Sequence, residues 1–140
     1  MLAVKRILRY LKGTPDFGLW YPKCTNTTVT TYTDADWAGS MDDRKSTSGN
    51  AFLMGDCLVA WFNKKRSSIS LSTAEAEYIA ATNCCTQILW MKEDLKDVNI
   101  ETKHPITIYC DNTSVISVRK NPVMHSKTKH IPIKYHFLRE

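Results

Sequence analysis

Three acidic residues of this 140-residue chain could do chemistry together, because two follow predicted strands and the third lies near the buried face of a predicted helix. Asp34 follows Val29–Thr33 (VTTYT), a run of β-branched and aromatic residues that strongly favours a strand. Asp111 follows Ile106–Tyr109 (ITIY), an apolar run typical of a strand buried on both faces. Glu77 lies close to the apolar face of a predicted helix. We expect the fold to decide whether the three carboxylates meet.

Convergence of these carboxylates would point to a metal centre. Buried like charges repel and raise each other's pKa unless a cation neutralises them. Hard carboxylate oxygens suit magnesium or manganese. Two such ions held about 4 Å apart support the in-line attack of water on a phosphodiester.

Two of these acidic residues also have structural interpretations that the sequence leaves open. Asp34 and Asp36 could belong to a turn, since Asp and the nearby Gly39 both favour turns. Asp111 could simply be the N-cap of a helix predicted over Thr113–Lys120.

The elements that must position these residues can be predicted from patterning. Ala51–Met54 and Cys57–Phe62, joined by Gly55-Asp56, indicate a β-hairpin that continues the strand at Val29–Thr33 into a meander. A long helix follows, and the strand after it should lie parallel to its neighbour. The fold class is therefore α/β (α+β), with an antiparallel three-strand meander and one parallel strand in a mixed central sheet flanked by helices.

The long helix begins at a capping signal. Ser72-Thr73 supply the N-cap, and Glu75 is placed for a capping box. Glu75 is thus explained by the helix end and its dipole. Glu77 is not, and it remains the candidate for chemistry on this helix.

Composition fits one globular domain with a modest preference for anionic partners. The chain is 43% hydrophobic and 24% charged, and Lys and Arg exceed Asp and Glu by 19 − 14 = +5. Five cysteines without a CxxC spacing form neither a disulfide framework nor a zinc signature, which favours a reducing compartment. Because no apolar run approaches the roughly 20 residues of a membrane span, we expect no membrane partner.

The first 28 residues are predicted to be a segment apart from the main domain. Apolar residues mark one face of a helix over residues 1–11, and basic residues occupy much of the rest. Phe17–Tyr21 (FGLWY) is a short strand candidate, and the polar residues 23–28 form the boundary. The helix fits a packing or docking element better than a nucleic-acid contact, and an organellar targeting role is a weaker alternative. We therefore divide the chain into residues 1–28, a connecting segment, and residues 29–140, the main domain.

Basic residues occur in two clusters that could contact phosphates or simply be solvated. The first lies in Asn63–Ser68 (NKKRSS) and the second in His125–His130 (HSKTKH). The candidate phosphate contacts are Lys64, Lys65, Arg66, Lys127, Lys129 and His130.

Several multi-residue motifs, in order along nearly the whole chain, closely resemble one known family. They are TDADWAG (Thr33–Gly39), DRKSTSG (Asp43–Gly49), STAEAEY (Ser72–Tyr78), YCDN (Tyr109–Asn112) and KHIPIKYHFLRE (Lys129–Glu140). These motifs are similar to those of the ribonuclease H domain of copia-type retrotransposon Pol polyproteins. KRILRYLKGT (Lys5–Thr14) and GLWY are similar to the segment that joins this domain to the reverse transcriptase.

The resemblance implies a three-layer ribonuclease H-like fold that cleaves the RNA strand of an RNA–DNA hybrid with two Mg²⁺ (or Mn²⁺) ions. It assigns metal binding and catalysis to Asp34, Glu77 and Asp111, and it leaves Asp36 and Glu75 as supporting residues. It also implies a reverse transcriptase partner in the intact polyprotein. The location implied is the cytoplasm, in a virus-like particle, with the nucleus as a further possibility.

Two departures from the family pattern bear on activity. Pro132 stands where relatives carry Asp, and the chain ends before the strand and helix that would bring a fourth metal-binding carboxylate. With three of four carboxylates, we expect two-metal hydrolysis to be impaired. The alternative is an inactive retrotransposon remnant that at most binds nucleic acid.

Overall fold

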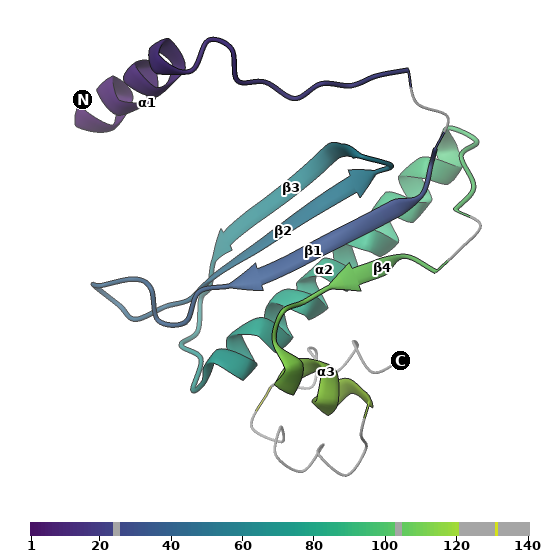
Figure 1. The fold of residues 1–140 in the computed structure, drawn as a ribbon. Helices are drawn as coiled ribbons and strands as arrows, with labels where there is room; N and C mark the ends of the chain where they lie inside the picture. The colour runs from purple at the N-terminus through teal and green to yellow at the C-terminus, as the bar shows by residue number, and fades with distance from the viewer. Residues whose placement is uncertain (24–25, 103–104, 121–130, 132–140) are drawn as a thin grey trace.

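A computed structural model describes residues 1–23, 26–102, 105–120 and Ile131. Figure 1 shows the elements in chain order: α1 (Leu2–Gly13), β1 (Val29–Ala35), β2 (Thr47–Met54), β3 (Cys57–Lys65), α2 (Thr73–Asp97), β4 (Thr107–Tyr109) and α3 (Thr113–Lys120). The predicted mixed α/β class is confirmed.

The four strands form one mixed sheet in the order β3-β2-β1-β4. β1 and β2 pair antiparallel, as do β2 and β3, whereas β4 lies parallel to β1. Gly55, at a φ of 59°, turns the β2–β3 hairpin in the left-handed conformation that suits glycine. The predicted meander and parallel strand are therefore confirmed, and the arrangement is consistent with a ribonuclease H-like fold.

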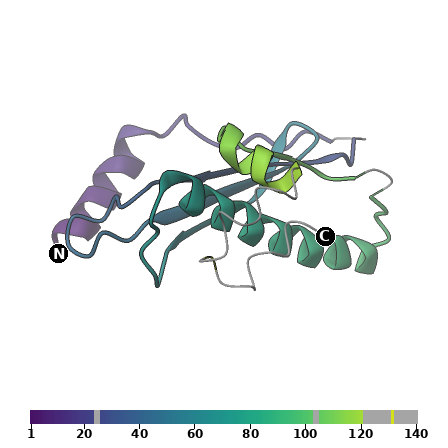
Figure 2. The same cartoon turned by 90° about the horizontal axis from the view of Figure 1, so that it is seen from below.

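α2 packs along one face of the sheet, as both ribbon views show (Figures 1 and 2). Phe52 of β2 forms a buried cluster with Cys84 and Ile88 of α2. Tyr78 and Ile79 form a second cluster with Val115, Ile131 and the partly buried Cys110 and Val118, which ties α3 to α2. α2 also contacts β1, whose end carries Asp34, and the Cys84 Sγ lies 3.6 Å from the hydroxyl of Thr31 on this strand.

The opposite face of the sheet is open in the described part of the chain. Its exposed aromatic side chains include Tyr32, Trp61 and Tyr109, and the rings of Tyr32 and Tyr109 stack with centroids 5.1 Å apart. Thr107 and Tyr109 of β4 are both exposed. The prediction of a strand buried on both faces was thus wrong, because β4 is short and one of its two faces borders the open side.

Other boundaries also differ from the prediction. Phe17–Tyr21 is not a strand: it pairs with none of the described strands, although the Tyr21 hydroxyl donates to the Leu58 carbonyl across 2.7 Å. β2 and β3 are longer than the predicted hairpin strands, because residues 47–50 and 63–65 also belong to them. Polar side chains are buried in this extension, including Ser48 and Asn50, and hydrophobic patterning cannot detect such a strand.

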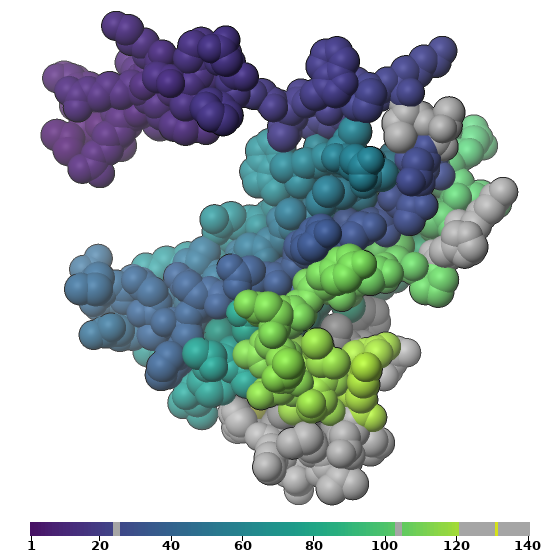
Figure 3. All heavy atoms as spheres, in the orientation of Figure 1, coloured from purple at the N-terminus to yellow at the C-terminus, as the bar shows by residue number. Residues whose placement is uncertain are grey.

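α1 forms as predicted but stands clear of the sheet, as Figure 3 shows, and none of its residues is buried. Its apolar face is therefore exposed in this chain. None of the described helices has both the length and the apolar character needed to span a membrane. The helix expected to begin at residue 133 lies outside the described residues.

Candidate metal centre

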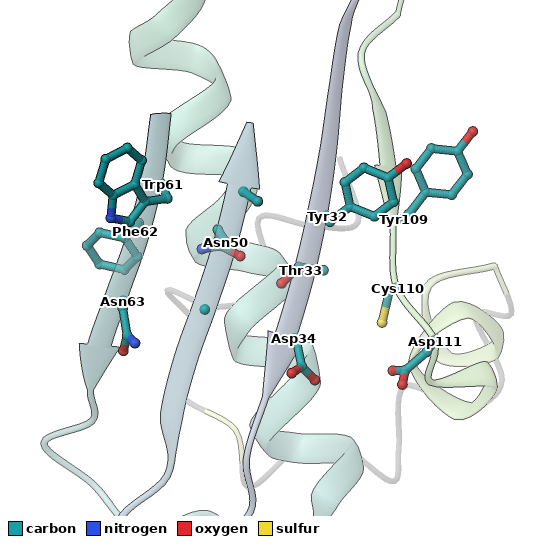
Figure 4. A pocket seen from close by; sticks show the side chains of 12 residues that line it. Tyr32, Thr33, Asp34, Asn50, Trp61, Phe62, Asn63, Tyr109, Cys110 and Asp111 are labelled. Carbon is teal, nitrogen blue, oxygen red and sulfur yellow. The ribbon is translucent and has the colours of Figure 1, made fainter. Parts of the chain in front are cut away.

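β1 delivers Asp34 to one end of the sheet. Along this strand Thr31 and Thr33 are buried, while Tyr32 and Asp34 are exposed, as the two-residue period requires. The Asp34 carboxylate points toward that of Asp111, which follows the parallel strand β4 (Figure 4). Both carboxylates thus lie at the end of the sheet where these two parallel strands stop.

The capping residues of α2 set the position of Glu77. The Ser72 hydroxyl accepts a hydrogen bond from the Glu75 N–H across 3.1 Å, and Glu75 Oε2 accepts one from the Leu71 N–H across 2.6 Å. The predicted capping role of Glu75 is therefore confirmed. Glu77, two residues further along, faces the end of β1 instead.

Glu77 is the buried acid of the site, with 6% of its surface exposed. Its Oε1 accepts a hydrogen bond from the Ala35 N–H across 3.2 Å, whereas its Oε2 is buried without a hydrogen-bond partner among the described residues. Burial, with added repulsion from Asp34 and Asp111, raises the pKa of Glu77 to about 7. Such an oxygen, close to two further carboxylates, is suited to bind a cation.

Asp111 is not the cap of α3. That role belongs to Asn112, whose Oδ1 accepts hydrogen bonds from the N–H groups of Ser114 (3.0 Å) and Val115 (3.2 Å). The alternative interpretation of Asp111 as a helix cap was therefore wrong. Its exposed carboxylate lies on the Asp34 side in Figure 4, and one of its oxygens is within 4.8 Å of a Glu77 oxygen.

Cys110 is a neighbour that sequence reasoning missed. Its Sγ and carboxylate oxygens of Glu77 and Asp111 all lie within 4.8 Å of one another. Partial burial raises the pKa of the Cys110 thiol, and the nearby carboxylates raise it further. The available signal was its position between the end of β4 and Asp111.

The acidic cluster opens onto a hollow on the exposed face of the sheet, shown in Figure 4. The hollow has a volume of about 620 Å³ and reaches from Asp34 and Asp111 to Tyr32, Asn50 and Trp61. An extended ligand could therefore approach the carboxylates along this face.

Asp36 supports the adjacent loop. Its carboxylate accepts a hydrogen bond from the Thr47 N–H, and Gly39 packs so closely on this carboxylate that a Cβ there would overlap it. The contact agrees with the supporting role expected for Asp36.

The basic residues of the first cluster, Lys64, Lys65 and Arg66, differ in their exposure to solvent. Lys64 and Lys65 are exposed at the end of β3, and Lys65 forms an ion pair with Asp43 across 2.9 Å. Hydrogen bonds from Ser40 and Lys65 lower the pKa of Asp43. Arg66 is only 8% exposed, a placement that does not favour phosphate contact. Lys127, Lys129 and His130 lie outside the described residues.

Known proteins match this chain over nearly its full length. It is 42% identical over 137 residues, 98% of the chain, to the retrovirus-related Pol polyprotein from transposon RE2 of Arabidopsis thaliana. It is 41% identical over 138 residues, 99% of the chain, to that from transposon TNT 1-94 of Nicotiana tabacum. The chain is homologous to one segment of retrovirus-related Pol polyproteins.

This segment is short relative to the polyproteins, since it spans 9% of the first and 10% of the second. A secreted RxLR effector protein of Plasmopara viticola is also similar, at 38% identity over 89 residues, which are 64% of this chain and 63% of that protein. No protein-family model matches. The chain therefore corresponds to a transposon-derived polyprotein region. This agrees with the resemblance of its motifs to Pol polyproteins.

Proposed function

We propose that this chain is the ribonuclease H-like domain of a copia-type retrotransposon polyprotein and hydrolyses the RNA strand of RNA–DNA hybrids. The observation that supports this most directly is Glu77, a buried carboxylate that has an oxygen without a hydrogen-bond partner among the described residues and whose pKa is raised by burial and by the charges of Asp34 and Asp111. The similarity to Pol polyproteins supports the proposal independently.

The residues present fit a hard divalent cation such as Mg²⁺ or Mn²⁺. Asp34, Glu77 and Asp111 offer carboxylate oxygens, and a cation would compensate both their repulsion and the unpartnered Glu77 Oε2. When bound, such ions polarise the phosphate and favour ionisation of the attacking water.

The chain itself supplies orientation. The Ala35 N–H fixes one oxygen of Glu77, so the other is directed at the cluster. Asp34, on β1, and Asp111, after β4, would supply the remaining carboxylate ligands. Lys64, exposed at the end of β3, would bind a phosphate of the substrate, and the hollow on the open face would admit the nucleic acid.

The polyprotein relatives suggest a place for residues 1–28 in this function. The exposed apolar face of α1 would dock on the reverse transcriptase of the intact polyprotein, the partner that the resemblance of residues 5–14 implies. Asp34, Glu77 and Asp111 lie on elements other than α1, so we expect α1 to affect substrate delivery more than the chemistry.

A labelled RNA–DNA hybrid assay in Mg²⁺ or Mn²⁺ tests the proposal. Metal-dependent cleavage that is lost in both Asp34→Asn and Asp111→Asn would support it, and Asp56→Asn, an exposed hairpin acid, is the matched control. Cleavage that persists in Asp111→Asn would contradict the site. Hybrid binding without cleavage in either metal would instead identify an inactive nucleic-acid-binding remnant.

A further inference from the structure

The acidic cluster contains a sulfur donor that a pure magnesium site does not need. Cys110 Sγ lies within 4.8 Å of carboxylate oxygens of both Glu77 and Asp111, and those two oxygens are equally close to each other. Glu77 is more than nine-tenths buried, and its Oε2 has no hydrogen-bond partner among the described residues. One sulfur and two carboxylates thus converge, and no described residue donates a hydrogen bond to the buried Glu77 Oε2.

This donor set favours a different class of metal from the one proposed above. Magnesium prefers oxygen ligands and binds thiolates poorly, whereas zinc-class ions bind thiolate and carboxylate together. We propose that Glu77, Cys110 and Asp111 form a binding site for a zinc-class divalent cation, with Cys110 as the thiolate ligand. On binding, the Cys110 S–H bond breaks, its proton passes to solvent, and the sulfur bonds to the metal.

The inference rests on the carboxylate cluster of the proposed function but requires no hydrolysis. Because Glu77 and Asp111 belong to both sites, a zinc-class ion and Mg²⁺ exclude each other. Zinc would therefore inhibit hybrid cleavage by occupying residues that magnesium needs. Zinc should compete strongly with magnesium because the Cys110 thiolate adds to the affinity for zinc and not to the affinity for magnesium.

The other described cysteines lack such surroundings. Cys84 is buried, with its Sγ 3.6 Å from the Thr31 hydroxyl. Cys85 is half-buried like Cys110, but it lies under the influence of the Arg119 charge, which disfavours a bound cation. Cys85 is therefore the matched control for Cys110.

Titration of the reduced, metal-stripped full chain with Co²⁺, a spectroscopic substitute for zinc, tests the proposal. We expect a thiolate-to-cobalt absorption band that saturates at one equivalent, disappears in Cys110→Ser and is retained in Cys85→Ser. Circular dichroism verifies that both variants fold. A band that is missing from the wild-type chain, or that survives in Cys110→Ser, would overturn the inference.

A second measurement needs no variant. Zn²⁺ should slow alkylation of Cys110 by iodoacetamide, mapped by peptide mass spectrometry, and should leave the rate at Cys85 unchanged; equal protection of both, or of neither, contradicts the site. The two proposals also fail separately. A cobalt–thiolate band without hybrid cleavage in Mg²⁺ refutes only the nuclease, and cleavage without the band refutes only the zinc-class site.

Discussion

The backbone N–H of Ala35 donates a hydrogen bond to Glu77 Oε1 across 3.2 Å, and this bond joins the last residue of β1 to the buried face of α2. It occupies one carboxylate oxygen and leaves Oε2 beside the other acids. Since Ala35 follows Asp34 directly, the same bond also sets the spacing between Asp34 and Glu77. The end of β1 therefore helps to position the carboxylates of the candidate metal centre.

Glu77 should make the metal-free protein less stable as pH rises. Its pKa is about 7 in the folded chain and ordinarily 4.5, so the folded state retains a proton that the unfolded state loses in this window. The stability that this residue contributes is complete below pH 4.5 and is lost as pH rises through 7, by about 3 kcal/mol. Urea unfolding in EDTA between pH 4.5 and 8 measures this loss.

Glu77→Gln is the control for that pH dependence. The variant should lose most of the decline, because a neutral amide replaces the titrating acid. Magnesium should restore stability to the wild-type chain at pH 8 and do little for the variant, since a ligand that binds only the folded state stabilises it. Identical pH profiles for the two proteins would show that Glu77 titrates normally.

Asp111 and Asn112 should separate activity from stability. Asn112→Ala removes the cap of α3 and should lower the free energy of unfolding by about 1 kcal/mol. Asp111→Asn should leave stability at neutral pH equal or higher, because it relieves repulsion, and should abolish metal-dependent cleavage. Thermal unfolding and the hybrid assay on both variants measure this contrast; a large stability loss in Asp111→Asn would argue for a structural role.

Gly39→Ala should destabilise the loop that follows β1. The new Cβ would overlap the Asp36 carboxylate, which must then move away from the Thr47 N–H. We expect a loss of about 1 to 3 kcal/mol, as for other overpacked sites. Gly18→Ala, where nothing lies within 4 Å, is the matched control in the same denaturant titration. Equal effects of the two substitutions would contradict the contact.

Lys64→Ala should weaken hybrid binding at low salt without changing the fold. Loss of one phosphate contact should reduce the slope of log affinity against log salt by about one unit. Lys96→Ala is the comparison, because Lys96 is also exposed but pairs with Glu93 in the last turn of α2. Fluorescence anisotropy over a salt series distinguishes the two, and an unchanged slope would remove Lys64 from the interface.

Much of the fold could be predicted because local signals and tertiary structure agree. The Ser72 cap, the Gly55 turn and the β-branched run of β1 each appear where the sequence indicates. The parallel pairing of β1 and β4 followed from the helix between them. Asp34 lies near the end of β1 and Asp111 follows β4, as these signals indicated, and Glu77 lies on the buried face of α2.

The remainder depended on contacts between distant residues. Phe17–Tyr21 has the composition of a strand but finds no strand to pair with among those described, and the polar start of β2 is a strand only because β1 and β3 flank it. At the candidate metal centre, Cys110 belongs to no motif with a known ligand spacing, and Asp111 could equally have been a helix cap until the structure showed Asn112 in that role. The sequence identifies which side chains could cap a helix or bind a metal. Only the packed structure shows which of two neighbouring candidates, such as Asp111 and Asn112, takes each role.

The parallel pairing of β1 with β4 has a consequence for how this protein is made. Thr31 hydrogen-bonds to the carbonyl of Thr107, 76 residues further along, so β1 is synthesised long before its partner. The hairpin strands can form early, while the outer edge of β1 stays open to other chains. We expect the carboxylates to assemble among the last native contacts, and a nascent chain interrupted before β4 to be prone to aggregation rather than weakly active.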